Sequence, residues 1–352
     1  MKVRTRDFIY TKDDLYFATT NYIHPENRFI AFLRYIPNEN GDREKNGKKY
    51  SKVDSSQAYK YLREKHPEYL YFCNITNVEM MGVPHTKIQD IIKPENRLKK
   101  ILEEERGETD ELKGKLIDLA KFFHYKAGID YNDLGISGSI LPNLQKRDIS
   151  DLDFVVYGLE NHRIAIKTFK QFKDTEVYIE EIDKNITLNS IDNSYWDKLY
   201  NKRIKDSSLT KEEFSWYENR KNNRGVIDNT LFDILATKNW SEITGKWGDT
   251  KYTPLGIAKI EAKVKNSIGA YDNPATYSIE DVKLLEGKNY DICEVASFTH
   301  TYSGQAIENE VIIAKGKVEK VETSGKPTYY RIVVGTTRES INEYIKLKDS
   351  PV

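Results

Sequence analysis

The sequence predicts an α+β fold: a central α/β core with a mixed sheet, flanked by an N-terminal and a C-terminal β-rich domain. Three patterns support this prediction. Residues 1 to about 90 contain aromatic and β-branched runs bounded by turn residues, such as DDLYFATTNYI and NRFIAFLRYI. Apolar residues then recur at helical spacing through the middle of the chain. From about Tyr252 onward the pattern alternates with a period of two.

The chain has 352 residues, which is more than one hydrophobic core usually serves, so several domains are expected. We place an N-terminal β-rich domain at 1–92 and the α/β core at 93–250, with a helical insertion at about 159–224. A C-terminal β-domain follows at 251–352. Its short strands and turn signals make a barrel one arrangement for it.

The elements of the N-terminal domain follow from local signals. The two aromatic runs predict strands. The polar, glycine-bearing stretch PNENGDREKNGKKYSK, from Pro37 to Lys52, predicts a long exposed hairpin loop. The next segment, DSSQAYKYLREKHPEY, predicts a short helix that is capped by Asp54 or Ser55 and has Pro67 just beyond its end.

The middle of the chain is predicted to be mainly helical. The charged segment KPENRLKKILEEERGETDELKG favours a solvated helix, and TDELKGKLIDLAKFFHYKAGI predicts a second helix that ends at Gly128. A crossover helix in ENHRIAIKTFKQF and two further helices, in DNSYWDKLYNKRI and TKEEFSWYENRKNN, come next. GVIDNTLFDILATK then predicts a hairpin with Asp228 and Asn229 at its turn. In the last domain, GIAKIEAKV, EVIIAKGKVEKV and TYYRIVVGTT predict strands, the last two joined by the turn ETSGKP.

Composition narrows the class of protein. Hydrophobic residues make up 38% and charged residues 31% of the chain, as in an ordinary globular protein. Basic and acidic residues number 55 each, so the formal net charge is zero and the simplest argument for a nucleic-acid binder is absent. Cys73 and Cys293 show no metal-ligand or disulfide spacing. No apolar run suits a signal peptide or a membrane span, so we expect no membrane association and a cytoplasmic location.

The stretch LGISGSILPNLQKRDISDLDFVVYG, residues 134–158, carries the chemistry. LGI predicts a short buried strand, and SGS predicts a tight turn that leads into a helix. Because Gly138 has no Cβ, a ligand can approach the backbone closely there. Free N–H groups at the start of such a helix, with the hydroxyls of Ser137 and Ser139, would form a phosphate cradle. Gly and Ser are also simply common turn residues.

Asp151 and Asp153 open the next apolar run. Side chains alternate along a strand, so these two carboxylates point to the same side. They repel each other unless a positive charge lies between them, and an all-oxygen site favours Mg²⁺ or Mn²⁺. The alternative is a solvated pair on an exposed strand end. The apolar run FVVYG that follows weakens that alternative.

Together these two motifs resemble the signature of the DNA polymerase β-like nucleotidyltransferase superfamily. That signature is a Gly-Ser pair after an apolar strand, followed by Asp-x-Asp between apolar residues. Here Gly138-Ser139 precedes Asp151-Leu152-Asp153-Phe154 with matching spacing. The resemblance covers roughly residues 109 to 240, and the layout of the whole chain is similar to archaeal predicted nucleotidyltransferases. It implies that the α/β core is a nucleotidyltransferase core. It further implies that the turn holds the triphosphate of an NTP and that Asp151 and Asp153 bind two metal ions.

The resemblance also implies a third carboxylate on a neighbouring strand. Asp233 fits, because it lies between Phe232 and Ile234 in an otherwise apolar strand, where a lone charge would be costly. A structural aspartate paired with Arg224 or Lys238 is the alternative role. Asp228 is the second choice for the third carboxylate, although its place beside Asn229 is typical of a turn. The long insertion between Asp153 and Asp233 leaves their pairing in space open.

Two basic residues complete the predicted site. Lys146 and Arg147 precede the aspartates and could reach a triphosphate, although surface solubility explains them equally well. The predicted function is Mg²⁺-dependent transfer of a nucleoside monophosphate from an NTP to a hydroxyl of an RNA end, a protein or a small molecule. The alternatives are a catalytically inert nucleotide or nucleic-acid binding protein and, less favoured, a glycosyltransferase. The acceptor, the base and the oligomeric state stay open.

Overall fold

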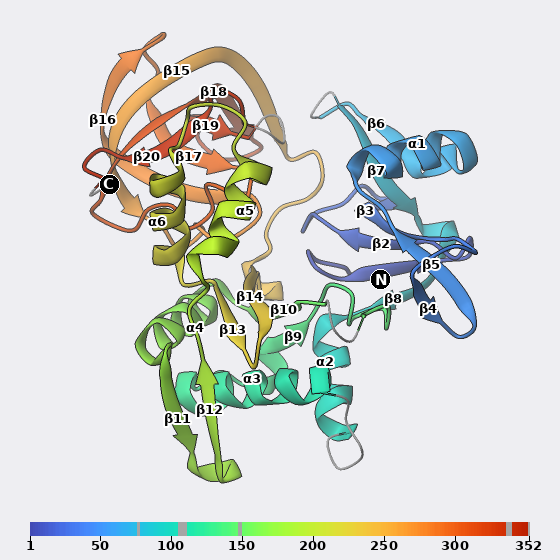
Figure 1. Cartoon of the computed structure of the whole chain (residues 1–352). Coiled ribbons are helices and arrows are strands. Elements are labelled where there is room, and N and C mark those ends of the chain that lie inside the picture. The colour runs from blue at the N-terminus through green and yellow to red at the C-terminus, as the bar shows by residue number, and fades with distance from the viewer. Residues whose placement is uncertain (76–77, 105–110, 147–149, 336–339, 351–352) are drawn as a thin grey trace. The chain divides into compact units, whose positions relative to one another are not determined.

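The computed structural model of the chain describes residues 1–75, 78–104, 111–146, 150–335 and 340–350 (Figure 1). The chain divides into two compact units. The first unit comprises residues 1–189 and 223–247, and the second comprises residues 190–222 and 248–352. The chain therefore leaves the first unit, enters the second, and returns once to complete the first.

The N-terminal part of the first unit is a sheet in which aromatic strands bury both faces. Its strands run in the order β4-β5-β3-β2-β1-β8, with β7 paired to β3 and β6 paired to β7. The helix α1 (Ser55–Lys65) begins at Asp54, whose carboxylate accepts from the backbone N–H of Gln57. The strands are β1 (Phe8–Thr11), β2 (Tyr16–Thr19), β3 (Arg28–Pro37), β4 (Arg43–Lys45), β5 (Lys48–Lys52), β6 (Leu70–Cys73), β7 (Val78–Pro84) and β8 (Ile88–Ile92).

The predicted loop at 37–52 is wrong. This segment forms the hairpin β4–β5, in which Arg43 pairs with Tyr50 and Lys45 with Lys48. Asn46 and Gly47 turn the chain, with φ values of 51° and 73°. Asn-Gly is the dipeptide that the tight hairpin turn prefers, because both central residues need positive φ. Because the segment is polar overall, its composition favoured a loop over a pair of strands.

The second sheet of this unit has four strands in the order β13-β14-β10-β9. β10 runs parallel to β14, and the other two pairs are antiparallel. Side chains from α3 and α4 pack on one face of this sheet and share a core with its strands (Figure 1). The elements are α2 (Pro94–Glu103), α3 (Glu111–Ala127), β9 (Leu134–Ile136), β10 (Leu152–Tyr157), α4 (Leu159–Phe172), β13 (Arg224–Ile227), β14 (Thr230–Thr237) and the hairpin β11 (Thr175–Ile179) and β12 (Lys184–Leu188).

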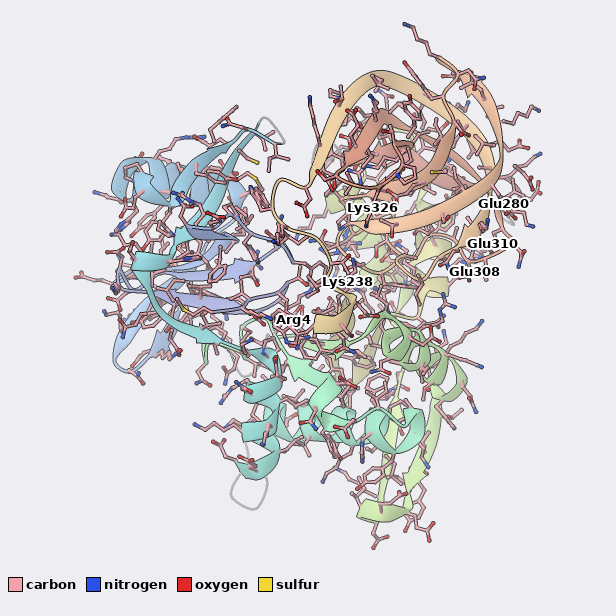
Figure 2. All side chains as sticks on the ribbon, turned by 180° about the vertical axis from the view of Figure 1, so that it is seen from behind. Arg4, Lys238, Glu280, Glu308, Glu310 and Lys326 are labelled. Carbon is pink, nitrogen blue, oxygen red and sulfur yellow. The ribbon has the colours of Figure 1, made fainter. Side chains whose placement is uncertain are left out.

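Arg4 ties the N-terminal segment to the end of β10. Its guanidinium lies 3.6 Å from the centroid of the Tyr157 ring and contacts Glu95 at 3.1 Å. It also donates to the carbonyl oxygen of Lys238 at 3.2 Å; Arg4 and Lys238 are both labelled in Figure 2. The Tyr157 hydroxyl donates to the same Glu95 carboxylate at 2.6 Å. These buried polar contacts join the two sheets of the first unit.

The second unit is a closed barrel with two helices. Five strands form the ring β15-β16-β17-β19-β18, which closes because β18 also pairs with β15, and β20 adds to β18. Apolar side chains around the helices α5 and α6 share one core with the barrel strands. The elements are α5 (Asn193–Arg203), α6 (Lys211–Lys221), β15 (Thr250–Asn266), β16 (Ala275–Glu286), β17 (Ile292–Ser297), β18 (Val311–Thr323), β19 (Tyr329–Val334) and β20 (Tyr344–Leu347).

The predicted fold class is wrong. We expected an α+β protein built on a central nucleotidyltransferase α/β core, but the chain is β-rich, with a half-barrel sheet and a closed five-stranded barrel. The described residues form six α-helices, and many more residues lie in strands. The prediction failed in part because β4 and β5 are polar strands without an apolar alternation to mark them, and because β11 and β12 are short strands with only two core residues each.

Two further expectations concern bonding and membranes. Cys73, which is buried, and Cys293, which is exposed, are not joined to each other by a disulfide. None of the helices in the described part of the chain is long and apolar enough to cross a membrane.

Candidate functional site

Two aspartates face each other across the central sheet. In the parallel pair of strands, Asp153 on β10 is the direct partner of Asp233 on β14. The residues beside each aspartate are buried in the core on the helix-covered face: Leu152, Phe154, Phe232 and Ile234. Because side chains alternate along a strand, both carboxylates must point to the opposite face. The pairing that the sequence left open therefore exists in the structure.

Asp151 lies two residues before Asp153, just ahead of β10, on the same side of the strand. Loss of hydration and the neighbouring charge of Asp153 raise the pKa of Asp151 above its ordinary value. The cations Arg224 and Lys52 oppose that rise. The charges of Asp153, Arg224 and Lys52 therefore all act on the Asp151 carboxyl. A cation bound between Asp151 and Asp153 would relieve the repulsion of these two carboxylates.

Gly138 lies directly against Asp153. Its φ is 61°, and a Cβ placed on it would come within 1.8 Å of a carboxylate oxygen of Asp153. The backbone N–H of Ser137 donates to the carbonyl oxygen of Asp153 at 2.9 Å. The turn at Ser137-Gly138 and the strand residue Asp153 are thus in direct contact. Only glycine leaves room for the carboxylate in this conformation.

Arg224 holds Asp233 with two hydrogen bonds. Its Nε lies 2.6 Å from one carboxylate oxygen, and its Nη2 donates to the other at 3.0 Å. Arg224 is the cross-strand partner of Asp233 in the antiparallel pair β13–β14, which explains the contact. The oxygens of Asp151, Asp153 and Asp233 do not all lie within 4.8 Å of one another. Convergence on one ion would therefore require at least one of these side chains to move.

The residues predicted to bind phosphate are engaged with the protein. The Ser137 hydroxyl is buried and donates to the carbonyl oxygen of Arg6, and the Ser139 hydroxyl donates to the hydroxyl oxygen of Ser150. Lys146 forms an ion pair with Asp42 from the N-terminal sheet. Arg147 lies outside the described residues.

The helix expected after the Gly-Ser pair is not present in residues 138–146. The chain makes successive turns there, with the N–H of Leu144 donating to the carbonyl oxygen of Ser139 at 2.9 Å. Asn143 adopts a φ of 58°, which the helical conformation excludes. The predicted phosphate cradle at a helix start therefore does not form in this segment.

Sequence reasoning missed three cations that come from the N-terminal sheet. They are Arg34 on β3, Arg43 on β4 and Lys52 on β5. The Arg43 guanidinium donates to the carbonyl oxygen of Leu144, within the loop that leads to the aspartates. The charges of Asp151 and Asp153 act on Lys52. The Asn46-Gly47 turn signal could have revealed the hairpin β4–β5. No local pattern in the sequence, however, shows which part of the chain this hairpin packs against.

The donor set of the site fits a hard divalent cation. Asp151, Asp153 and Asp233 offer carboxylate oxygens, which Mg²⁺ and Mn²⁺ prefer. The space beside Gly138 accommodates the Asp153 carboxylate, and a side chain there would fill it. These three aspartates are the residues that would hold such an ion.

A second group of potential ligands lies in the N-terminal sheet. Among the described residues, the ligand atoms of Asp13, His66 and Glu68 lie within 4.8 Å of one another. However, Lys87 places its ammonium 3.0 Å from the carboxylate of Asp13 and 2.8 Å from that of Glu68. The Tyr69 hydroxyl also donates to Asp13 at 2.5 Å. Lys87 already supplies the positive charge, so this group is an internal ion-pair network.

Comparison with known proteins gives one relative. The chain is 46% identical to uncharacterized protein MJ1086 of Methanocaldococcus jannaschii, over an alignment of 358 positions that covers 99% of this chain and 100% of the relative. No protein-family model matches the chain, and no solved structure matches it. The match therefore extends through both structural units of this chain.

Proposed function

We propose a function for this chain from the site alone. The chain belongs to the family of the archaeal protein MJ1086, but that relative is uncharacterized and so suggests no function. The chain is a Mg²⁺-dependent nucleotidyltransferase. It moves a nucleoside monophosphate from an NTP to an acceptor hydroxyl on an RNA end, a protein or a small molecule. The observation that carries the proposal is the in-register pairing of Asp153 with Asp233, with Gly138 closed against Asp153.

The carboxylates have distinct roles in this proposal. Asp151 and Asp153 would hold the cation, and Asp233 would join them from β14. Bound Mg²⁺ would neutralise phosphate charge and polarise the attacking hydroxyl. The protein itself positions the groups: Gly138 fixes the Asp153 carboxylate, and Arg224 orients Asp233. Such positioning, with charge stabilisation, supplies most of the catalysis in phosphoryl transfer.

The test is transfer of radiolabel from each α-labelled NTP, with Mg²⁺, to total RNA, a protein extract or a pool of small hydroxyl compounds. Asp153→Asn is expected to reduce labelling by about 100-fold to 1000-fold, because it removes a charge on which the cation depends. Asp183→Asn is the matched control, since Asp183 is an exposed left-handed residue in a position that Asn also adopts. Equal labelling by wild type and Asp153→Asn, both folded by circular dichroism, would contradict the proposal.

One observation favours a second function, a catalytically inert nucleotide or nucleic-acid binding protein. The bidentate contact of Arg224 with Asp233 already balances one of the three carboxylates. Calorimetric titration separates the two functions. Binding of RNA without binding of Mg²⁺–NTP favours the inert protein, whereas Mg²⁺–NTP binding that Asp153→Asn abolishes favours the transferase.

A further inference from the structure

The proposed transferase needs cations for the phosphate chain, and the described residues that the sequence offered for it, Ser137, Ser139 and Lys146, are occupied. The hydroxyls of Ser137 and Ser139 bond within the protein, and Lys146 pairs with Asp42. A triphosphate carries several negative charges, which three carboxylates would repel. Other described residues of this unit offer further positive charge for the phosphate chain.

The N-terminal sheet presents an aromatic face to the loop that leads to the aspartates. Phe8, Tyr16, Tyr35 and Tyr50 are buried in one cluster with Leu141 and Leu144 of that loop. We call these four aromatic residues the tyrosine face. Because a packed core fixes its members tightly, residues on this side of β3, β4 and β5 are held next to the part of that loop that contains Leu141 and Leu144.

The hairpin β4–β5 places two cations on the side of the tyrosine face. Lys52 is the cross-strand partner of Tyr35, and Arg43 is the partner of Tyr50. Directly opposite residues lie on the same face of an antiparallel pair. The Arg43 guanidinium is 5.5 Å from the centroid of the Tyr35 ring and donates to the carbonyl oxygen of Leu144.

A β-bulge adds Arg34 to this set. Tyr16 faces Tyr35 across β2–β3 and Phe17 faces Leu33, so Arg34 is the extra residue between two registered pairs. Bulges change the direction of a side chain and are common next to active sites. The backbone N–H of Val53, the residue after Lys52, donates to the carbonyl oxygen of Arg34 at 3.0 Å, so the backbone of Arg34 lies beside that of Lys52. Together with burial, the charge of Arg34 also lowers the pKa of Lys52.

The cations repel each other. Burial and the charges of Arg34 and Arg43 lower the pKa of Lys52, and Asp153 and Asp151 oppose that change only in part. Neither Arg34 nor Lys52 has a side-chain hydrogen bond or an ion pair with any residue that the structure describes. Like charges gathered beside a candidate metal site are best compensated by a bound polyanion.

We propose that Arg34, Arg43 and Lys52 bind the phosphate chain of the nucleotide on which Asp151, Asp153 and Asp233 act. The inference rests on the proposed function and deepens it, because it assigns triphosphate recognition to the N-terminal sheet. Arg43 has a second role, since its bond to Leu144 attaches the hairpin to the loop. Lys52 and Arg34 are therefore the residues to substitute.

The experiment is isothermal titration of the full chain with inorganic tripolyphosphate and with Mg²⁺–NTP. Lys52→Gln and Arg34→Gln are each expected to weaken binding about tenfold, the loss expected for one charge-assisted contact. Lys49→Gln is the matched control, because Lys49 is exposed and points to the other face of β5. Lys52→Arg keeps the charge and is expected to bind like wild type, which separates loss of the cation from misfolding.

The outcomes distinguish this inference from the proposed function. Tripolyphosphate binding that depends on Lys52 in a protein without transfer activity supports the inference and contradicts the function. The opposite result is transfer that depends on Asp153 while the KM for NTP stays unchanged in Lys52→Gln and Arg34→Gln. That result would support the proposed function and contradict the inference. Wild-type protein that binds neither tripolyphosphate nor Mg²⁺–NTP, or variants that bind as well as wild type, would overturn the inference.

Discussion

At the residue scale, the carboxylate of Asp233 has two competing roles. Its register opposite Asp153 suits a shared metal site, and its register opposite Arg224 suits an ion pair. Both roles follow from one position, because β14 lies between β10 and β13. The sequence suggested both partners but could not choose between them, since the choice depends on strand order.

Gly138 gives a prediction at this scale. Gly138→Ala puts a Cβ where the Asp153 carboxylate now lies and strains a φ of 61°. We expect nucleotide transfer to fall about 100-fold, since a shift of about 1 Å in a reacting group has that effect. The free energy of unfolding should fall by only about 1–2 kcal/mol. Radiolabel transfer and chemical denaturation measure the two effects.

Gly128→Ala is the control for that prediction. Gly128 has a φ of 68°, and a Cβ there meets no atom within 4 Å. The two variants share the backbone strain, and only Gly138→Ala disturbs Asp153. Similar activity in both variants would show that the close approach of Gly138 to Asp153 has no part in function.

At the element scale, the hairpin β4–β5 has a larger role in our proposal than its composition suggests. Its polar sequence is typical of a surface loop, yet it supplies Tyr50 to the core and would supply Arg43 and Lys52 to the phosphate-binding site. Its turn depends on Gly47, where φ is 73° and a side chain would meet open space. A substitution at Gly47 can therefore destabilise the hairpin turn without removing any side-chain contact of Arg43 or Lys52.

Gly47→Val tests this role of the hairpin. A β-branched residue at positive φ should lower the free energy of unfolding by about 1–2 kcal/mol. It should also weaken Mg²⁺–NTP binding, because Arg43 and Lys52 lose their fixed positions. Gly325→Val is the matched control, since Gly325 turns the barrel hairpin β18–β19 with a φ of 71° and equally open space. Calorimetric affinities that fall equally in both variants would contradict a specific role for β4–β5.

At the scale of the whole molecule, a buried carboxyl makes stability depend on pH. Asp7 is fully buried, and burial raises its pKa to about 7, against the opposing charge of Lys93. Below about pH 4 the carboxyl is protonated in both the folded and the unfolded chain. As the pH rises from about 4 to about 7, the unfolded chain ionises first, and the folded state loses stability.

Asp7→Asn should remove this loss. The amide oxygen can still accept from the backbone N–H of Arg4, which the Asp7 carboxylate now does at 3.1 Å. We expect the variant to gain about 2–4 kcal/mol relative to wild type between pH 4 and pH 7, with no further gain above that range. Thermal melts across this pH range measure the effect. A difference in Tm that stays constant with pH would contradict it, and Asp54→Asn at an exposed helix cap controls for the chemistry of the substitution.

The sequence alone determined the local devices of this protein. The Gly-Ser turn, the two aspartates before an apolar strand, the hairpin turn at Asp228-Asn229 and the helix cap at Asp54 can each be recognised within about a dozen residues. They are local because backbone conformation and alternation of side chains act over short distances. Even so, the predicted fold class was wrong, in part because polar strands such as β4 and β5 lack the apolar pattern that marks a strand in the sequence.

Only the tertiary structure decided which groups meet. It set β10 beside β14, so that Asp153 faces Asp233, and it set β13 on the other side, so that Arg224 holds that carboxylate. It also packed Leu141 and Leu144 of the loop before the aspartates against the N-terminal sheet, where Arg43 donates to the carbonyl oxygen of Leu144. Strand order and core packing join residues far apart in the chain, and such long-range pairings leave no local pattern in a single sequence.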